Sequence, residues 1–284
     1  MSVIDPSLGT VFCEGRSGGV DVLMLAALLP LGQVSIRPVG GKHGMRAFIE
    51  GYLDNYRERQ PPYLAFRDRD FDVEPPASVH LIRLQEQKPI WLSHRAAIEN
   101  YFIDADLISQ YWTEQEKSSS WSYGPAPSTS TIEHHIVESA RELVGYQAVR
   151  WALARLKPAP RWPEIRTTWT KHGSGNLPSS LAYDHCFDQA CKLIIAFREQ
   201  IQGIRLDCFQ EYAQEYRDRF GKTSFLENRR FLIWFHGKDH IVRLCHRLAP
   251  NFPRRHYTSW AAEHIDIGAH SDLQELVVRA RKLA

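Results

Sequence analysis

Residues 9–66 alternate short apolar runs with glycine-rich turns and helix-like segments, and this alternation restricts the fold more than any other feature. Residues 9–13 and 34–39 are short runs typical of strands, and a third such run covers residues 63–66. Between them, residues 20–29 form an apolar segment and residues 45–56 place apolar side chains at helical spacing. Strands that alternate with helices predict an α/β fold with a mostly parallel sheet covered by helices on both faces.

The rest of the chain becomes progressively more helical. We expect a fourth strand at residues 79–84 and a helix that Ser93 caps and that continues to residue 103. A stretch rich in Ser, Pro and Gly follows, and it predicts a loop. Amphipathic patterns then predict further helices at residues 132–156, 181–197, 209–220 and from residue 271 onward.

These patterns suggest two folded parts joined by a linker. We expect an α/β domain at residues 1–115, a linker or loop at 116–131, and a mainly helical domain at 132–284. Within the last part, residues 231–245 could return to the active site of the first.

Composition fits a globular protein of one or two domains. The chain has 284 residues, of which 43% are hydrophobic, and its formal charge is only +2, so no global basic field indicates a nucleic-acid partner. Five cysteines at irregular spacing favour reduced thiols over a disulfide framework. No signal peptide or membrane span is apparent, and we expect a cytoplasmic protein with no membrane partner.

An acidic stretch follows the third predicted strand. Asp68, Asp70 and Asp72 occupy alternate positions, and in extended chain they would point to one side. Clustered carboxylates suit Mg²⁺ or Mn²⁺, which prefer hard oxygen ligands. The alternative interpretation is a solvated acidic turn in which Arg67 and Arg69 pair locally.

A second acidic position follows the first predicted strand. In a doubly wound sheet, the carboxyl ends of two strands can face the same crevice. One of these strands ends at Glu14, and the other precedes Asp68 and Asp70. This arrangement resembles a Toprim domain, which carries one Glu after its first strand and an Asp-x-Asp after its third. The resemblance covers roughly residues 9–104.

Further motifs resemble a narrower group, the OLD-family Toprim nucleases, and in particular the Toprim effectors of PARIS phage-defence systems. These motifs are Gly41-Lys42, Asp68-Arg69-Asp70-Phe71-Asp72, Arg95-x-x-x-Glu99-Asn100-Tyr101 and Gly237-Lys238-Asp239.

The resemblance implies roles for individual residues. Glu14 matches a metal ligand or general base, and Asp68 and Asp70 match the metal ligands of the Asp-x-Asp. Glu99 matches an acidic residue that completes a second metal site, and either Lys238 or Lys42 matches a lysine that stabilises phosphate charge.

One position departs from the OLD pattern, which places an Asp four residues after the first Glu. Here that position is Gly18, and Asp21, farther along, could substitute for it if the turn is longer. This departure puts the second metal site in doubt.

Simpler interpretations of the same residues stay open. Glu14 could cap the next helix, and Glu99 could form only an ion pair with Arg95. Lys42 could be a solvated turn lysine, and Asp72 could simply neutralise a neighbouring arginine, which is the interpretation we favour for Asp72.

The resemblance implies a Mg²⁺-dependent endonuclease that cleaves nucleic acid, plausibly tRNA, by two-metal hydrolysis. It also implies a partner ATPase of the ABC type that holds the nuclease inactive until a phage trigger releases it, after which the freed protein would dimerise. Antiviral defence by abortive infection would be the outcome. The alternatives are a catalytically idle Toprim-like binding module and a Toprim enzyme of the primase or topoisomerase kind.

Overall fold

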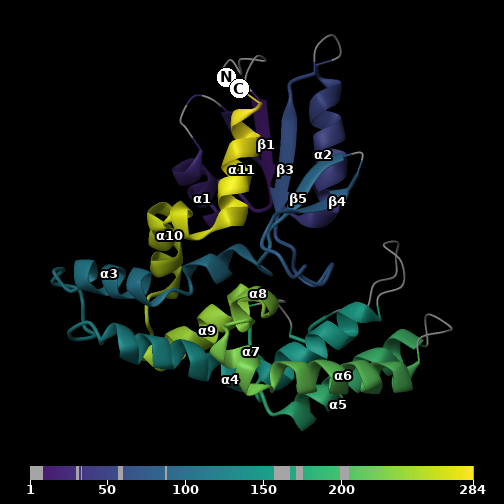
Figure 1. The fold of residues 1–284 in the computed structure, drawn as a ribbon, viewed down its shortest axis with the longest axis vertical. Helices are drawn as coiled ribbons and strands as arrows, with labels where there is room; N and C mark the ends of the chain where they lie inside the picture. The colour runs from purple at the N-terminus through teal and green to yellow at the C-terminus, as the bar shows by residue number, and fades with distance from the viewer. Residues whose placement is uncertain are drawn as a thin grey trace. The chain divides into compact units, whose positions relative to one another are not determined.

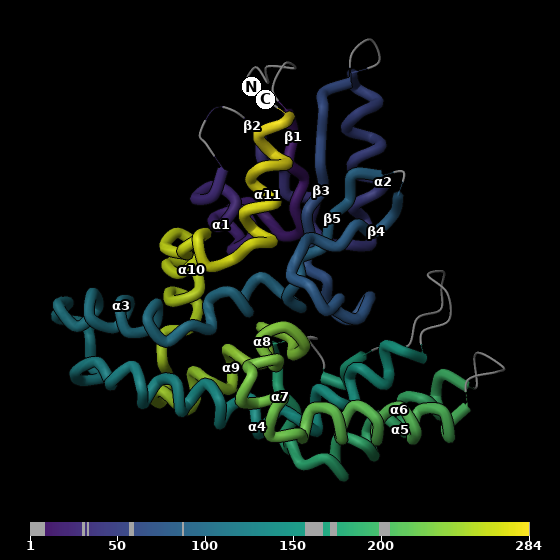
Figure 2. The backbone as a smooth tube through the Cα atoms, in the orientation of Figure 1, coloured from purple at the N-terminus to yellow at the C-terminus, as the bar shows by residue number. Residues whose placement is uncertain are grey.

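The computed structural model describes residues 9–29, 32, 34–56, 60–86, 88–156, 167–170, 175–198 and 205–283, and the account below is limited to these. Their contacts divide the chain into two compact units. The sheet unit contains Met1–Arg69, Pro75–Phe102 and Arg255–Ala284, and the helical unit contains Asp70–Glu74 and Ile103–Arg254. Figures 1 and 2 show the course of the chain through both units.

The sheet unit is built on a five-stranded sheet with the order β2-β1-β3-β5-β4. Strands β1, β2, β3 and β5 are mutually parallel, and β4 pairs antiparallel with β5. The bounds are Gly9–Cys13 (β1), Val34–Pro38 (β2), Tyr63–Arg67 (β3), Ile82–Gln85 (β4) and Lys88–Leu92 (β5). The mostly parallel α/β sheet that the strand–helix alternation predicts is therefore confirmed.

Helices cover the two faces of this sheet (Figure 1). They are α1 (Val20–Leu28), α2 (Lys42–Asp54) and α11 (Ser271–Arg281). The unit also contains α10 (Arg254–His264) and the 3₁₀ helices η1 (Ile98–Phe102) and η2 (Ile267–Ala269). Ile90 of β5 belongs to a core cluster with side chains of α2, whereas the next residue, Trp91, lies 3.7 Å below the guanidinium of Arg279 in α11. Since successive strand residues point to opposite faces, α2 and α11 cover opposite faces of the sheet.

The helical unit is organised around α4, a helix of 27 residues that packs against α3, α5, α6, α7 and α9. Its helices are α3 (Ala105–Gln115), α4 (Thr129–Arg155), α5 (Tyr183–Arg198), α6 (Leu206–Phe220), α7 (Thr223–Glu227), α8 (Phe231–Trp234) and α9 (Gly237–Leu248). Ser128 caps α4, because its side chain accepts a hydrogen bond from the backbone N–H of Thr131. No helix among the described residues is long and apolar enough to cross a membrane.

Several expected elements differ in the structure. The fourth strand begins at Ile82, three residues later than expected, and it is the antiparallel edge strand. Strand β3 lies between β1 and β5, and the sequence pattern did not predict β5. The helix expected after Ser93 is wrong, because the chain forms bends there and then the short 3₁₀ helix η1. The Ser93 hydroxyl instead donates to the carbonyl of Arg95.

The two compact units also differ from the expected domain boundaries. The α10–α11 region belongs to the sheet unit, whereas α3 belongs to the helical unit. The acidic stretch is divided, with Asp68 and Arg69 in the sheet unit and Asp70–Glu74 in the helical unit. The linker expected at 116–131 lies inside the helical unit, where Trp112 and Trp121 both donate to the carbonyl of Gly124.

Candidate functional site

Parallel strands bring several predicted site residues to one edge of the sheet unit. Strands β1 and β3 are neighbours and run in the same direction, so Glu14 and Asp68 both follow the carboxyl end of their strand. Strand β5, next to β3, leads into η1, which carries Glu99. This carboxyl edge is where open α/β sheets place their binding sites.

The turn after β1 is paired with the turn after β2. The backbone N–H of Gly40 donates to the carbonyl of Gly15 at 2.8 Å, and the N–H of Gly15 donates back at 3.3 Å. Both glycines have positive φ values, 101° and 89°, which other residues rarely adopt. The pairing holds Glu14 near the start of α2, whose first residue is Lys42.

Asp21 lies beside the same turn, in the first turn of α1. A Cβ atom added to Gly15 would come within 2.9 Å of a carboxylate oxygen of Asp21, so that carboxylate packs directly against the glycine. Burial, together with the negative charges of Asp21 and Glu14, raises the pKa of the Cys13 thiol to about 12. The two carboxylates therefore share one neighbourhood, although seven positions separate them in the sequence.

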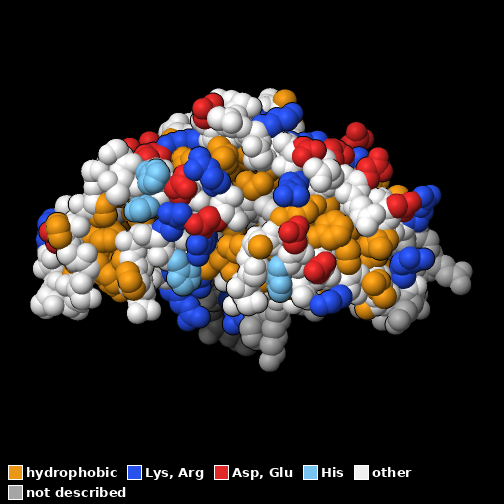
Figure 3. Space-filling view, turned by 90° about the horizontal axis from the view of Figure 1, so that it is seen from below, with side chains coloured by type: hydrophobic (Ala, Val, Ile, Leu, Met, Phe, Trp, Pro, Cys, Tyr) orange, Lys and Arg blue, Asp and Glu red, His pale blue; other side chains and the backbone are white. Residues whose placement is uncertain are grey.

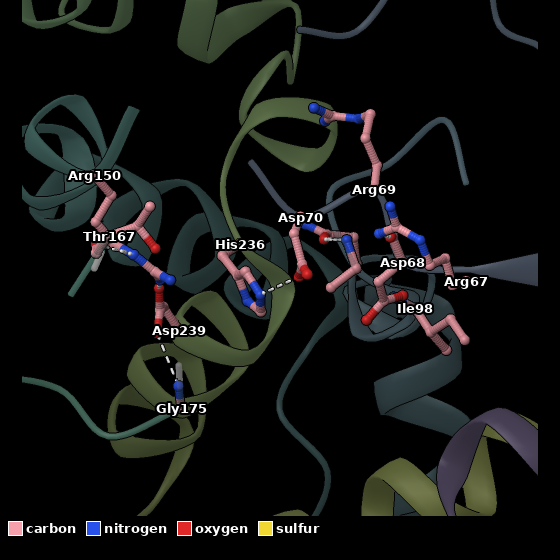
Figure 4. A network of polar contacts seen from close by, with 12 residues as sticks. Arg67, Asp68, Arg69, Asp70, Ile98, Arg150, Thr167, Gly175, His236 and Asp239 are labelled. Atoms are coloured by element: carbon pink, nitrogen blue, oxygen red, sulfur yellow. Dashed lines mark hydrogen bonds and ion pairs between the residues drawn. The ribbon is translucent and has the colours of Figure 1, made fainter. Parts of the chain in front are cut away.

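Asp68 connects the end of β3 to η1 (Figure 4). Its side chain is 4% exposed, and its Oδ1 atom accepts a hydrogen bond of 2.8 Å from the backbone N–H of Ile98. Glu99 is the next residue, and its Oε2 atom is buried, as is Oε2 of Glu14. Asp68 thus fixes the position of the 3₁₀ helix that carries Glu99.

The arginines beside Asp68 are buried, which excludes the interpretation of a solvated acidic turn for this part of the stretch. Arg69 is 0% exposed, and its Nε donates to the carbonyl of His94 at 3.2 Å. Arg67 donates from Nη1 to the carbonyl of Asp68 at 2.9 Å. Backbone carbonyls therefore bind both guanidinium groups, that of Asp68 for Arg67 and that of His94 for Arg69.

The expectation that Asp68, Asp70 and Asp72 point to one side of an extended chain is wrong. Strand β3 ends at Arg67, and Asp70 has a left-handed backbone with φ of 52°. Asp70 contacts His236, and Asp72 lines a pocket of about 560 Å³ with Arg155 and other residues of the helical unit. The strand alternation fails because the chain turns immediately after the strand.

Within the helical unit, the first turn of α9 carries Lys238 and the buried Asp239, and the buried His236 directly precedes the helix. Asp239 forms an ion pair with Arg150 of α4 and accepts hydrogen bonds of 2.9 Å from Gly175 and Gln147. Burial alone would raise the pKa of Asp239, but these partners outweigh it and the pKa is lowered. The turn that carries Lys238 is consequently held in place on both sides.

The donor types at the carboxyl edge fit a hard divalent cation, because Glu14, Asp21 and Asp68 offer carboxylate oxygens. In their present positions, however, the described residues include no group of three or more His, Cys, Asp or Glu side chains that could hold a metal ion. The described residues therefore include carboxylates of the type that a cation site needs, but these side chains are not grouped so that they could hold a cation.

Sequence reasoning missed the residues that surround the predicted ones, namely His236, Gln147 and Arg150. They lie far from the acidic stretch in sequence and belong to no recognisable spacing. The only available signal was the position of His236 directly before Gly237-Lys238-Asp239.

Of the tryptophans in irregular segments, Trp121 packs edge-on against Trp112 at 5.3 Å and Trp169 against Tyr146 at 5.4 Å, so both contribute to packing. All five cysteines are free thiols.

Comparisons with known proteins assign no family to the chain. No known protein family, no curated protein and no solved structure matches the chain.

Proposed function

We propose that this protein is a nuclease that hydrolyses phosphodiester bonds with the help of Mg²⁺ or Mn²⁺. The observation that carries the proposal is the placement of Glu14 and Asp68 at the carboxyl ends of two neighbouring parallel strands, with the carboxylate of Asp21 packed against Gly15. Such carboxylates are suited to hold a divalent cation, which when bound would polarise the phosphodiester and activate water.

The chain's own residues have distinct roles in this proposal. Glu14 and Asp68 would hold the cation, with Asp21 as a further ligand. Glu99, on the helix that Asp68 fixes, would take part in a second cation site. Lys238 or Lys42 would stabilise negative charge on the phosphate.

A nucleic-acid substrate is supported by one basic pocket in the helical unit. This pocket has a volume of about 670 Å³, and its described lining includes Arg243, His246 and Arg254 but no Asp or Glu. Elsewhere, acidic and basic side chains are interspersed on the face drawn in Figure 3. A local pocket, rather than a broad basic surface, is therefore our candidate for phosphate contacts.

Biological context rests on the resemblance to the OLD-type Toprim nucleases alone. It suggests tRNA as the substrate, an ABC-type ATPase as the partner that restrains the nuclease, and a homodimer after release. Phage defence in the cytoplasm is the corresponding proposed role.

The decisive experiment compares wild-type protein with Glu14→Gln and Asp68→Asn, with and without the proposed ABC-type ATPase partner, on tRNA and plasmid DNA in Mg²⁺ or Mn²⁺. We expect cleavage by the wild type, its loss on chelation with EDTA, and a loss of at least about a hundredfold in both variants. The matched control is Glu50→Gln, because Glu50 is an exposed carboxylate on α2 that pairs with Arg46. Full activity in Glu14→Gln would refute the proposed mechanism.

A second candidate is a catalytically idle binding module with a nuclease-like sheet. The observation in its favour is that no group of three metal-ligating side chains is assembled among the described residues. Titration calorimetry with Mn²⁺ separates the two, since only the nuclease requires the cation. Absence of both Mn²⁺ binding and cleavage would favour the binding module.

A further inference from the structure

The starting observation is the basic pocket of about 670 Å³ in the helical unit. Helix α9 contributes Val242, Arg243 and His246 to its lining, and Arg254 is the first residue of α10. The other described lining residues belong to the segment 175–181. All of these residues lie in one compact unit, so the shape of the pocket is set within that unit.

Hydrogen bonds hold the segment 175–181 against its surroundings. The backbone N–H of Gly175 donates at 2.9 Å to Oδ1 of Asp239, a buried residue in the first turn of α9 (Figure 4). Toward the other end, the thiol of the buried Cys186 donates to the carbonyl of Ser180 at 3.7 Å. This part of the lining is therefore preformed, which reduces the entropic cost of binding a ligand.

The pocket carries an excess of positive charge. Glu142 forms ion pairs with both Arg243 and Arg247, so one carboxylate faces two guanidinium groups. Arg254 has no ion-pair partner among the residues that the structure describes. His246 is exposed and adds a further charge when it is protonated. The lining therefore favours an anion, and the planar donor set of arginine suits the oxygens of a phosphate group.

The same pocket has an apolar part. Leu177, Pro178, Leu181 and Val242 are among its lining residues. Its volume of about 670 Å³ falls within the range of about 300–1,000 Å³ that is usual for small-molecule sites. A single nucleotide combines a phosphate group with the flat, largely apolar faces of a base, so it matches the size and both parts of the lining.

We propose that this pocket binds one nucleotide through a phosphate monoester, either at the end of a nucleic-acid chain or in a free nucleotide. A monoester carries a charge of about −1.5 to −2 at pH 7 and three acceptor oxygens, whereas an internal phosphodiester carries a single negative charge. Two arginines with no acidic residue in the described lining favour the higher charge. For the chain end, the inference rests on the proposed function and names the part of the substrate that the helical unit recognises.

The test is competition binding to the full chain in EDTA, so that neither a cation nor cleavage is involved. The probe is an internally labelled single-stranded oligonucleotide of randomised sequence with phosphates at both ends, followed by fluorescence anisotropy. The competitors are the same oligonucleotide with hydroxyls at both ends, the common nucleoside monophosphates, and the nucleosides. We expect each phosphorylated ligand to bind at least about tenfold more tightly than its hydroxyl counterpart, because hydrogen bonds to charged groups contribute this much.

Three variants connect this preference to the pocket. Arg254→Gln should weaken binding of the probe at least about tenfold, and Arg254→Lys should lose less because it keeps a cation. Arg141→Gln is the matched control, since it removes the same charge from the same unit, pairs with Glu138 and does not line the pocket. It should leave the affinity unchanged.

Equal affinities for phosphorylated and hydroxyl ligands in the wild type would overturn the inference. An equal loss in Arg254→Gln and Arg141→Gln would also overturn it, because general charge attraction would then explain the binding. Nucleoside monophosphates that compete as well as the probe would identify a free nucleotide as the ligand, whereas a much tighter oligonucleotide would identify a chain end.

The outcome also separates this inference from the proposed function. Phosphate-dependent binding in EDTA without cleavage in Mg²⁺ or Mn²⁺ would place the failure in the proposed nuclease. Cleavage in the presence of the cation, without any preference for the phosphorylated ligands, would refute the pocket inference alone.

Discussion

Arg150 and Asp239 form an ion pair from which solvent is excluded, with side-chain exposures of 2% and 0%. Arg150 also donates from Nε to the carbonyl of Thr167, and its guanidinium lies 4.3 Å from the ring of Phe71. The pair thus connects α4 to the first turn of α9 and to the acidic stretch.

Replacing one member of this pair leaves the other charge buried and uncompensated. We expect Asp239→Asn to lower the free energy of unfolding by about 3–5 kcal/mol, measured by urea denaturation. The control is Asp207→Asn, which removes a fully exposed partner of Arg205 and should have little effect. Equal effects of the two substitutions would contradict the assignment of Asp239 to a buried pair.

The buried carboxyl group of Asp239 also makes the stability of the protein depend on pH. Burial raises the pKa of Asp239, but Arg150, His236 and two hydrogen bonds outweigh it, so the pKa in the folded state is lowered. A carboxyl with a lowered pKa stabilises the fold above its unfolded pKa, and this contribution is lost as the pH falls through the folded value. Urea denaturation of the wild type should therefore show a steeper loss of stability on acidification than that of Asp239→Asn.

Lys238 and Lys42 can be distinguished by substitution. We expect Lys238→Ala to lower the rate of nucleic-acid cleavage by about 10²–10³, the usual effect of removing a group that stabilises negative charge in the transition state. Lys42 begins α2 behind a glycine turn, and Lys42→Ala should have a smaller effect. Single-turnover cleavage assays would measure both, and a larger loss in Lys42→Ala would reverse the assignment.

His94 is buried directly after β5, and within the described chain neither ring nitrogen has a hydrogen-bond partner. Burial, which outweighs the opposing effect of Asp272, lowers its pKa to about 4. Between about pH 6.5 and about pH 4, His94 is therefore protonated in the unfolded chain but neutral in the folded protein. The free energy of unfolding consequently falls as the pH drops through this range. His94→Leu should be as stable as the wild type at pH 7 and should lose stability less steeply over this range.

Chemical denaturation of His94→Leu at pH 7 and pH 5 would test this expectation. A large destabilisation at pH 7 would instead show that the imidazole makes a favourable interaction in the folded protein.

Gly9 marks a close approach between β1 and the end of the chain. A Cβ atom at this position would lie 2.3 Å from Cβ and 2.6 Å from the carbonyl oxygen of Leu283, so Gly9→Ala should displace the segment after α11 and destabilise the protein by about 1–3 kcal/mol. Gly51, within α2, has open space around it, and Gly51→Ala should stabilise by about 0.5–1 kcal/mol. Thermal unfolding would show shifts of opposite sign, and equal shifts would refute the close contact.

The local sequence pattern was enough to predict many of the strands and helices of the sheet unit. The strands β1, β2 and β3 and the helices α1 and α2 were predicted because each has its own apolar periodicity and turn residues. The position of Glu14 and Asp68 at one edge followed because parallel strands share a direction. The Toprim resemblance, the cation and the substrate remain predictions.

Only the tertiary structure decided the rest, because those features depend on residues distant in sequence. Strand β5 forms by pairing with β3. Its first two residues, Lys88 and Pro89, are not typical of strands, so the local sequence does not indicate one. The left-handed turn at Asp70 replaced the alternation expected of an extended chain, and its partner His236 lies 166 positions away. Periodicity records which residues favour a strand or helix, whereas contacts between residues far apart in sequence arise only when the folded chain buries their polar groups together.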